Sequence, residues 1–202
     1  CILNGTTNYI LTQMIKEGKS FETALAGAQE NGYAEKDPTA DVEGFDTCRK
    51  IAILTSLAFG KFVNSEDIQT EGITNITLED VEYASEFGGV IKLVGMSERA
   101  ENGAYARVCP VILKKDHPLA GIDDVFNGIL VKGDALGDVM FYGRGAGSLP
   151  TASAVVSDVV DIIKHKHTHI VLGWTEGEPG YLLDADDQAF RMYVRISGSS
   201  DS

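Results

Sequence analysis

The sequence predicts an α+β fold in which a largely antiparallel mixed sheet packs against helices. Three observations support this class: helical patterns fill the chain to about residue 87, strand patterns follow to about residue 142, and one more helical pattern comes after them. Helices and strands that are segregated along the chain are typical of α+β domains, whereas a doubly wound fold alternates them. The chain has 202 residues, enough for one substantial domain.

Two helices are expected in the first 32 residues. Residues 4–8 supply several N-cap side chains for the first helix, which should stop at Gly18. Ser20 begins the second helix, and Gly32 suits the left-handed position that follows a helix end.

The longest helix is expected over residues 41–59, with Asp41 as its N-cap and Gly60 after its last turn. The second half of this segment is apolar almost all round, which indicates that the helix is buried there. A shorter helix should follow over residues 77–87.

Four strands are expected over residues 90–99, 105–113, 125–132 and 139–142. Asn102-Gly103 lies between the first two and is a strong signal for a two-residue hairpin loop. Pro150 should occupy the first position of the last helix, which ends near His165. Alternation of apolar with basic or aromatic residues over 190–196 indicates a further, exposed strand.

The charge of the chain excludes several classes of partner. A net charge of −13 repels nucleic acid phosphates and anionic membranes. No apolar run approaches the roughly 20 residues of a membrane span. The three cysteines are odd in number and far apart, which favours reduced thiols and a cytoplasmic location.

An acidic segment over residues 35–50 carries the strongest chemical signal. It holds five acidic residues, followed by Arg49 and Lys50. In a continuous helix, Glu43, Asp46 and Lys50 would share one face. A partly buried lysine among carboxylates can donate or accept a proton, because its pKa can be tuned towards neutrality. The alternative is a solvated helix face whose Asp46–Lys50 pair stabilises the helix by about 0.2–0.5 kcal/mol.

Three segments resemble signature motifs of the homoserine dehydrogenases. They are Asn-Gly-Thr-Thr-Asn-Tyr-Ile-Leu at 4–11, the glycine- and acid-rich segment at 32–50, and Gly-Ala-Gly-x-x-Pro-Thr-Ala-Ser-Ala-Val at 145–155. The second motif is long and specific. All three occur in the right order, so the resemblance covers about residues 2–165.

The resemblance implies NAD(P)-dependent interconversion of L-homoserine and L-aspartate 4-semialdehyde, in the biosynthesis of threonine, methionine and isoleucine. It implies that Lys50 is the proton donor to the aldehyde oxygen and accepts the hydroxyl proton in the reverse direction. Glu35 and Asp46 would bind homoserine, with Asp41 close by. Carboxylates suit the α-ammonium group of this substrate, because they accept charge-assisted hydrogen bonds from it.

The resemblance also implies that Gly32 and Gly147 approach the cofactor. The glycine-rich loop at 143–147 lacks the G-x-G-x-x-G spacing of a dinucleotide fingerprint, so it should close over the reactive end of the cofactor. The family's Rossmann domain should precede Cys1, together with a further catalytic lysine and a monovalent-cation site. No metal is therefore assigned to this chain, and the fragment alone should be inactive.

The expected division of the chain is a catalytic and dimerisation domain over 1–168 and a C-terminal extension or linker over 169–202, which ends before any regulatory domain. The resemblance implies a homodimer built through the sheet, with the hairpin at 102–103 as a candidate contact. The alternative is a non-catalytic dimerisation or regulatory module of the same fold. The presence together of Lys50, Glu35, Asp41 and Asp46 argues against it.

The alternating histidines His165, His167 and His169 could suggest a metal site. Their expected position at a helix C-terminus gives a simpler account, because positive charge is favoured there. No carboxylate or cysteine partner is evident nearby in the sequence, so metal binding is not expected at these residues.

Overall fold

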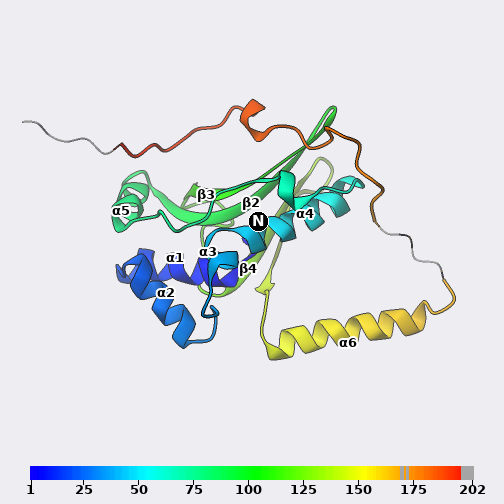
Figure 1. Ribbon diagram of the computed structural model, residues 1–202, viewed down its shortest axis with the longest axis horizontal. Coiled ribbons are helices and arrows are strands. Elements are labelled where there is room, and N and C mark those ends of the chain that lie inside the picture. Colours follow the sequence, from blue (N-terminus) through cyan, green and yellow to red (C-terminus); the bar gives the residue numbers. More distant parts are fainter. Residues whose placement is uncertain (169–170, 172, 197–202) are drawn as a thin grey trace, which may run out of the picture.

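The computed structural model describes residues 1–168, 171 and 173–196, and it has the mixed α+β architecture that the sequence predicts. A long β-hairpin crosses the body, helices pack against it, and the last helix projects away from the rest (Figure 1). The helices are α1 (Gly5–Glu17), α2 (Phe21–Glu30), α3 (Thr39–Val42), α4 (Phe45–Phe59), α5 (Leu78–Glu86) and α6 (Ser148–Lys164). The strands are β1 (Gln69–Thr70), β2 (Gly89–Ala100), β3 (Gly103–Lys114), β4 (Phe126–Gly133) and β5 (Gly137–Arg144).

The strands form two separate sheets. In the first, β3 lies between β1 and β2, pairing parallel with β1 and antiparallel with β2. The second is the antiparallel β4–β5 hairpin. The first sheet is therefore mixed but largely antiparallel, as predicted. No helix in the described ranges is both long enough and apolar enough to cross a membrane.

The main core lies between the helices and the β2–β3 hairpin. Ile10, Leu11 and Met14 of α1 are fully buried against Leu93 of β2 and Val108 of β3, among other apolar residues. Complete burial of each such side chain contributes about 1.5–3 kcal/mol to stability. This core fixes the start of α1 next to the sheet, where the candidate site is formed.

The predicted caps of the first two helices are confirmed, whereas Asp41, predicted to cap the long helix, lies inside α3. The side chain of Asn4 accepts a hydrogen bond from the Thr7 amide at the start of α1, and Ser20 caps α2 in the same way. Gly18 follows α1 in a left-handed conformation. Thr77 and Asp80 form a reciprocal capping box at the start of α5.

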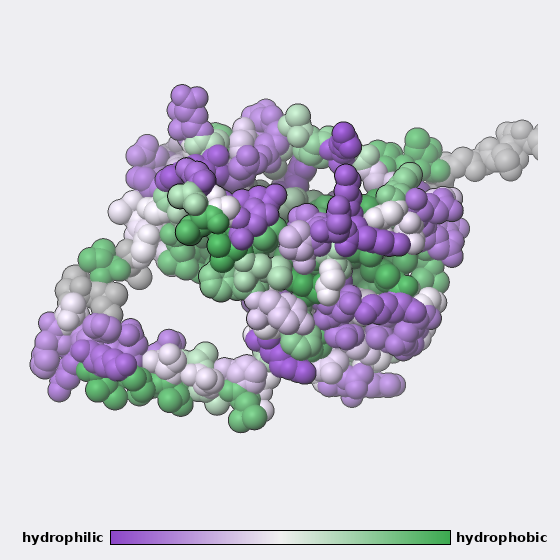
Figure 2. Space-filling view, turned by 180° about the vertical axis from the view of Figure 1, so that it is seen from behind, coloured by the Kyte–Doolittle hydropathy of each residue, from purple (hydrophilic) through white to green (hydrophobic). Residues whose placement is uncertain are grey.

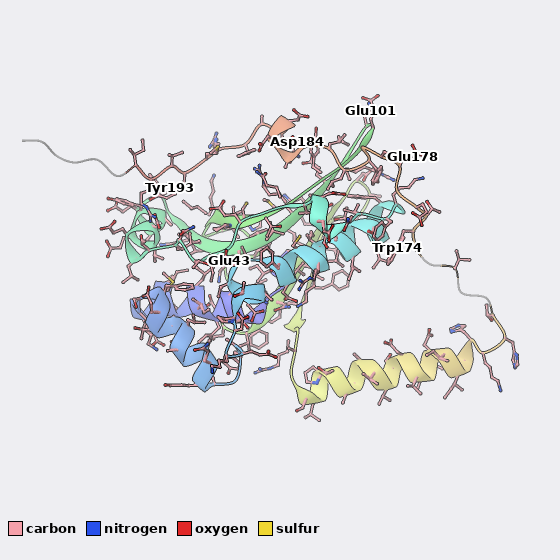
Figure 3. All side chains as sticks on the ribbon, in the orientation of Figure 1. Glu43, Glu101, Trp174, Glu178, Asp184 and Tyr193 are labelled. Carbon is pink, nitrogen blue, oxygen red and sulfur yellow. The ribbon has the colours of Figure 1, made fainter. Side chains whose placement is uncertain are left out.

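The prediction of one continuous helix over 41–59 is wrong. Helix α3 ends at Val42 and α4 begins at Phe45, because Gly44 between them has a left-handed φ of 82°. A β-carbon at Gly44 would also lie 3.2 Å from the Thr70 methyl group, so only glycine suits this turn. The break takes Glu43 off the helix face (Figure 3), and its carboxylate instead accepts a 2.6 Å hydrogen bond from Thr74.

The prediction that the second half of α4 is buried all round is also wrong. Its buried face includes Thr55 and Ser56, whose hydroxyls donate to backbone carbonyls one turn earlier. Ile53 and Leu57 face outwards and are each about half exposed. Hydroxyl groups that bond within their own helix can be buried at little cost, so apolar content alone did not identify the inner face.

Three smaller expectations also need correction. Ala100 pairs with Gly103, so the loop of the β2–β3 hairpin is Glu101-Asn102 and not Asn102-Gly103. Pro150 is the third residue of α6, not the first. Residues 190–196 form no strand, and they are held against the body by side chains without a backbone ladder.

The C-terminal segment 184–196 lies over the β3 and α5 side of the body (Figures 1 and 3). The Arg107 guanidinium of β3 lies 4.3 Å from the Phe190 ring centre and pairs with Asp186 at 2.8 Å. Further along, the Tyr193 hydroxyl donates to Asp80 at 2.8 Å, and Arg195 pairs with the same carboxylate at 2.5 Å. Asp80 thus holds both the start of α5 and the C-terminal segment.

Replacing Asp80 with alanine is expected to lower stability by about 1–2 kcal/mol, in line with loss of a helix cap, and to release the C-terminal segment. Burial raises the pKa of Asp80, but hydrogen bonds from Thr77 and Tyr193 and the charge of Arg195 outweigh it and hold the pKa below its usual value. The stabilisation is therefore present near neutral pH and lost as pH falls through that lowered pKa.

Thermal unfolding and tryptic cleavage after Arg191 and Arg195 would measure both effects. Glu79→Ala is the matched control, because Glu79 is exposed in the same first turn of α5. Equal cleavage rates in the Asp80 and Glu79 variants would show that Asp80 does not hold the segment.

Candidate active site

The predicted site residues that the structure brings together lie where α1, the α3–α4 break and the start of β4 meet. Asp41 comes from α3, Asp46 and Lys50 come from the first half of α4, and Asn4 precedes α1. The break at Gly44 turns the chain between the two aspartates, so that both can face Asn4. Three chain segments thus supply one polar cluster.

The Asn4 amide joins the two aspartates. Its nitrogen donates to Asp41 Oδ1 at 2.7 Å and to Asp46 Oδ2 at 2.8 Å, while its oxygen accepts from the Thr7 amide at 2.8 Å. Two carboxylates this close repel each other unless donors lie between them. Asn4 therefore allows two negative charges to share the site, a role that its motif and capping position alone did not reveal.

Lys50 lies at the other side of Asp46. Its ammonium group is 2.7 Å from Asp46 Oδ2 and 3.1 Å from the backbone carbonyl oxygen of Leu3. The two side chains are 46% and 30% exposed, so their ion pair contributes at most about 1 kcal/mol to stability. The contacts orient the ammonium group more than they stabilise the fold.

Asn127, at the start of β4, contacts the same backbone carbonyl. Its side-chain nitrogen donates to Leu3 O at 3.1 Å, the distance at which Lys50 also donates to that oxygen. Asn127 was not predicted as a site residue, because a single asparagine in a strand pattern carries no signal. Only the fold shows that it lies beside the lysine.

The remaining acidic residues of the 35–50 segment do not join this cluster. Glu35 is exposed, and its backbone carbonyl accepts a hydrogen bond from Gln29. Within the described chain, no hydrogen bond or ion pair links the Glu35 side chain to Asp41, Asp46 or Lys50. Asp37 accepts from Thr39 in its own turn. Two of the five acids, Asp41 and Asp46, therefore form the centre of the site.

The two glycines expected near a cofactor are both exposed. Gly32 has a φ of 72° and follows the C-cap of α2, Asn31, so the helix end explains its conformation by itself. Gly147 has a φ of 121° and is the N-cap of α6. The loop at 145–147 carries only one side-chain carbon, which leaves its backbone open to close approach by a flat ring.

A second lysine, Lys92 of β2, is buried behind α1 with only 1% of its side chain exposed. Its ammonium group lies 2.5 Å from the Ile122 carbonyl oxygen, 3.1 Å from Asn8 Oδ1 and 3.3 Å from Asp123. Burial lowers the pKa of Lys92, although the Asp123 charge opposes this. Its signal in the sequence is a lone lysine in the apolar run at 90–94, where no site was predicted.

The predicted absence of a carboxylate near the C-terminal histidines is wrong. Asp161, one turn earlier in α6, lies 3.0 Å from His165 Nδ1. Across residues 1–168, 171 and 173–196, no three His, Cys, Asp or Glu side chains converge in a way that could hold a metal ion. His169 lies outside the described residues.

Replacing Asn4 with alanine is expected to destabilise the protein by more than the loss of a helix cap, which costs about 1 kcal/mol. The excess arises because Asp41 and Asp46 would face each other without the shared donor. Ser20→Ala is the matched control, since Ser20 caps α2 and touches neither aspartate. Urea unfolding of both variants measures the difference, and equal losses would show that the Asn4 bridge contributes nothing.

Comparison with known proteins identifies the family. A family model described as homoserine dehydrogenase matches residues 1–160. The homoserine dehydrogenase of Synechocystis sp. is 54% identical over 166 residues, which span 80% of this chain and 38% of the relative. That of Helicobacter pylori is 42% identical over 200 residues, or 99% of this chain and 47% of the relative.

Solved structures give the same result. A crystal structure of the Staphylococcus aureus homoserine dehydrogenase superimposes with a TM-score of 0.79 at 45% identity, covering 85% of this chain and 44% of that one. The Thiobacillus denitrificans enzyme gives 0.81 at 46% identity, covering 90% and 42%. The chain spans less than half the length of each of these four proteins. Three motifs, a shared fold and the family match all agree, and the chain belongs to the homoserine dehydrogenase family.

Proposed function

We propose that this chain supplies the substrate-binding and proton-transfer residues for NAD(P)-dependent interconversion of L-homoserine and L-aspartate 4-semialdehyde, in the biosynthesis of threonine, methionine and isoleucine. The observation that carries the proposal is the joining of Asp41, Asp46 and Lys50 around the Asn4 amide. The relatives are named homoserine dehydrogenase, which supports the same reaction for the longer protein.

Lys50 is the proposed proton-transfer residue. Its side chain is about half exposed, so a substrate oxygen can approach it, and Asp46 and Leu3 O hold its ammonium group in one position. In the reducing direction Lys50 Nζ donates a proton to the aldehyde oxygen as it becomes a hydroxyl. In the oxidising direction the neutral amine takes the hydroxyl proton. Geometry of this kind is a requirement for general acid–base catalysis.

Asp41 and Asp46 are the proposed partners of the substrate ammonium group, with Glu35 as a further one. Asn4 uses Oδ1 of Asp41 and Oδ2 of Asp46, so Asp41 Oδ2 and Asp46 Oδ1 keep acceptor positions for another donor. A primary ammonium group donates up to three hydrogen bonds and gains from nearby carboxylates. Glu35 is exposed on the loop before α3 and would approach when substrate is bound.

NAD(P), when bound, gives or takes the hydride at the substrate carbon. We propose that Gly32 and Gly147 approach the cofactor and that other parts of the longer protein hold most of it. Loop 145–147 fits this role, because its exposed, almost side-chain-free backbone permits close contact with a planar ring.

The exposed apolar side chains of helix α6 indicate that another part of the longer protein packs against it. Figure 2 shows apolar residues gathered along one side of it. Seven of its aliphatic side chains are exposed: Leu149, Val155, Val156, Val159, Val160, Ile162 and Ile163. An apolar helix face of this length is normally buried. We propose that the cofactor-holding part of the longer protein covers it, and slower amide exchange in α6 of the full-length protein than in this chain would support this.

We further propose that the protein is a cytoplasmic homodimer assembled through the β2–β3 sheet. Residues 1–168 would form the catalytic and dimerisation region, and residues 169–202 would form an extension. The three cysteines are free thiols, as is usual in reducing compartments. Light scattering of the full-length protein measures the oligomeric state, and a monomer would contradict the dimer.

The decisive experiment is to follow homoserine-dependent reduction of NAD and of NADP by the full-length protein. Turnover with homoserine and none with serine would support the proposed reaction. A full-length protein that dimerises but shows no turnover with either cofactor would overturn it. The alternative, a non-catalytic dimerisation or regulatory module of the same fold, would then be the better description.

A further inference from the structure

Asn127 connects two parts of the proposed site that are far apart in sequence. It lies at the start of β4, and its side-chain nitrogen and Lys50 Nζ both donate to Leu3 O at 3.1 Å. The two nitrogens must therefore lie within about 6 Å of each other, a range in which a charge introduced at one position acts on a charge at the other. A change at Asn127 thus acts on the environment of Lys50 directly.

The glycine-rich loop packs on the same amide. A β-carbon on Gly145 would lie 2.1 Å from the Asn127 side-chain nitrogen and 2.7 Å from its Cγ. The loop backbone therefore rests on the Asn127 side chain with no room between them. The β4–β5 pairing sets this contact, since Asn127 is the register partner of Gly143, two residues before Gly145.

Aromatic and cationic contacts stiffen this end of the hairpin. The Phe126 and Tyr142 rings stack with centres 5.0 Å apart, and the Arg144 guanidinium lies 5.0 Å from the Phe126 ring centre. These residues flank Asn127 and Gly145 on both strands. The position of the loop relative to the amide is therefore fixed by packing as well as by backbone pairing.

The orientation of the amide is determined by its neighbours. With nitrogen and oxygen exchanged, the oxygen would face the Leu3 carbonyl, and two acceptors would repel each other. In the orientation found, Asn127 Oδ1 is buried and has no hydrogen-bond partner within the described part of the chain. A buried acceptor left unpaired is unfavourable and is usual only where a residue serves another purpose.

We propose that Asn127 is a positioning residue for Lys50. Asn127 and Lys50 both donate to Leu3 O, and the glycine-rich loop packs on the Asn127 amide, so Asn127 aligns the lysine with the loop. The inference rests on the proposed function, because Lys50 is taken as the proton-transfer group and the loop as the cofactor contact. Asn127 itself neither gives nor takes a proton. It sets the distance between the group that moves the proton and the loop beside the hydride carrier.

The test is Asn127→Asp in the full-length protein, a change that keeps the shape and removes the donor. The expected result is a fall in kcat for homoserine oxidation of about 10–100-fold, since misplacement of a reacting group by about 1 Å can cost that much. KM for homoserine should change less than twofold. The added negative charge favours the protonated form of Lys50, which cannot accept the hydroxyl proton, so the acid limb of the kcat–pH profile should move to higher pH.

Asn75→Asp is the matched control, because it makes the same chemical change at an exposed position in the loop before α5. Gly145→Ala is the second variant. It pushes on the amide without changing its chemistry, and it should lower kcat even if Asn127→Asp folds poorly. The inference would be overturned if Asn127→Asp and Gly145→Ala both kept the wild-type kcat and the wild-type acid limb and showed only a lower Tm.

One further measurement separates this inference from the proposed function. The rate at which Lys50 is acetylated, followed against pH by mass spectrometry, reports its protonation without any turnover. A shift to higher pH in Asn127→Asp supports the positioning contact even if the wild-type protein oxidises no homoserine. An identical profile in both proteins rejects the contact even if the wild type is fully active.

Discussion

Lys50→Met in the full-length protein is expected to lower kcat for homoserine oxidation by about 10²–10⁴-fold, the range that a positioned general base contributes. Methionine keeps the length and apolar part of the side chain but cannot take the hydroxyl proton. The Lys50–Asp46 pair is partly exposed, so Tm should change little. Initial rates at saturating homoserine and cofactor, together with a thermal melt, separate the loss of chemistry from a loss of fold.

Two further variants sharpen this prediction. Lys50→Arg should not rescue activity, because a guanidinium group stays protonated and cannot act as a base. Lys132→Met is the matched control, since Lys132 is an exposed lysine on β4. If the activity of Lys50→Met were within tenfold of the wild type, the proposed reaction would stand, but the proposed role of Lys50 in proton transfer would be wrong.

Lys92→Ala is expected to destabilise the protein by about 2–5 kcal/mol, as for other large-to-small changes in a core. The change removes a fully buried side chain and leaves Asn8 Oδ1 without the donor that it has now. Lys92→Met should cost less, because it fills the space and loses only the polar contacts. Urea unfolding midpoints measure both, and a loss below about 1 kcal/mol in the alanine variant would show that the cluster is dispensable.

The same lysine predicts a pH dependence of stability. Burial lowers the pKa of Lys92 in the folded protein below its ordinary value of 10.5, so the unfolded chain binds the extra proton between these two pKa values. Stability contributed by this group should therefore rise as pH increases through the lowered pKa towards 10.5. This rise should be absent from Lys92→Met. Parallel curves for both proteins above neutral pH would contradict it.

Local signals predicted most of the secondary structure. Ser20 caps the second helix as expected, Asn4 is one of the cap candidates expected before the first, and the four longer strands were expected close to their observed ranges. Each of these features depends on a few adjacent residues. The failures have a different origin: the close packing that favours glycine at position 44 comes from Thr70 and Glu71, which lie 26 and 27 residues later and come close only in the folded protein.

Only part of the site was predicted, because sequence patterns report contacts between neighbouring residues and not contacts across the fold. Asp46 and Lys50 are one helical turn apart, so their contact follows from spacing alone. Asn4, Asn127 and Lys92 gain their roles from contacts across the fold, and no pattern of neighbouring residues reports those. The resemblance to a family supplied the chemistry, whereas the structure supplied the polar residues that hold the lysine and the aspartates in place.

The Leu3 carbonyl also has a consequence for how the chain folds. It accepts hydrogen bonds from Lys50 and Asn127, which lie 47 and 124 positions further along the chain. Contacts between such distant residues form late, because large loops must close before they can be made. A partly folded chain can already contain α4, with Lys50 and Asp46 paired, while the carbonyl still lacks both donors. Acquisition of activity during refolding should therefore lag behind the recovery of helical circular dichroism, since the site is complete only when β4 has docked.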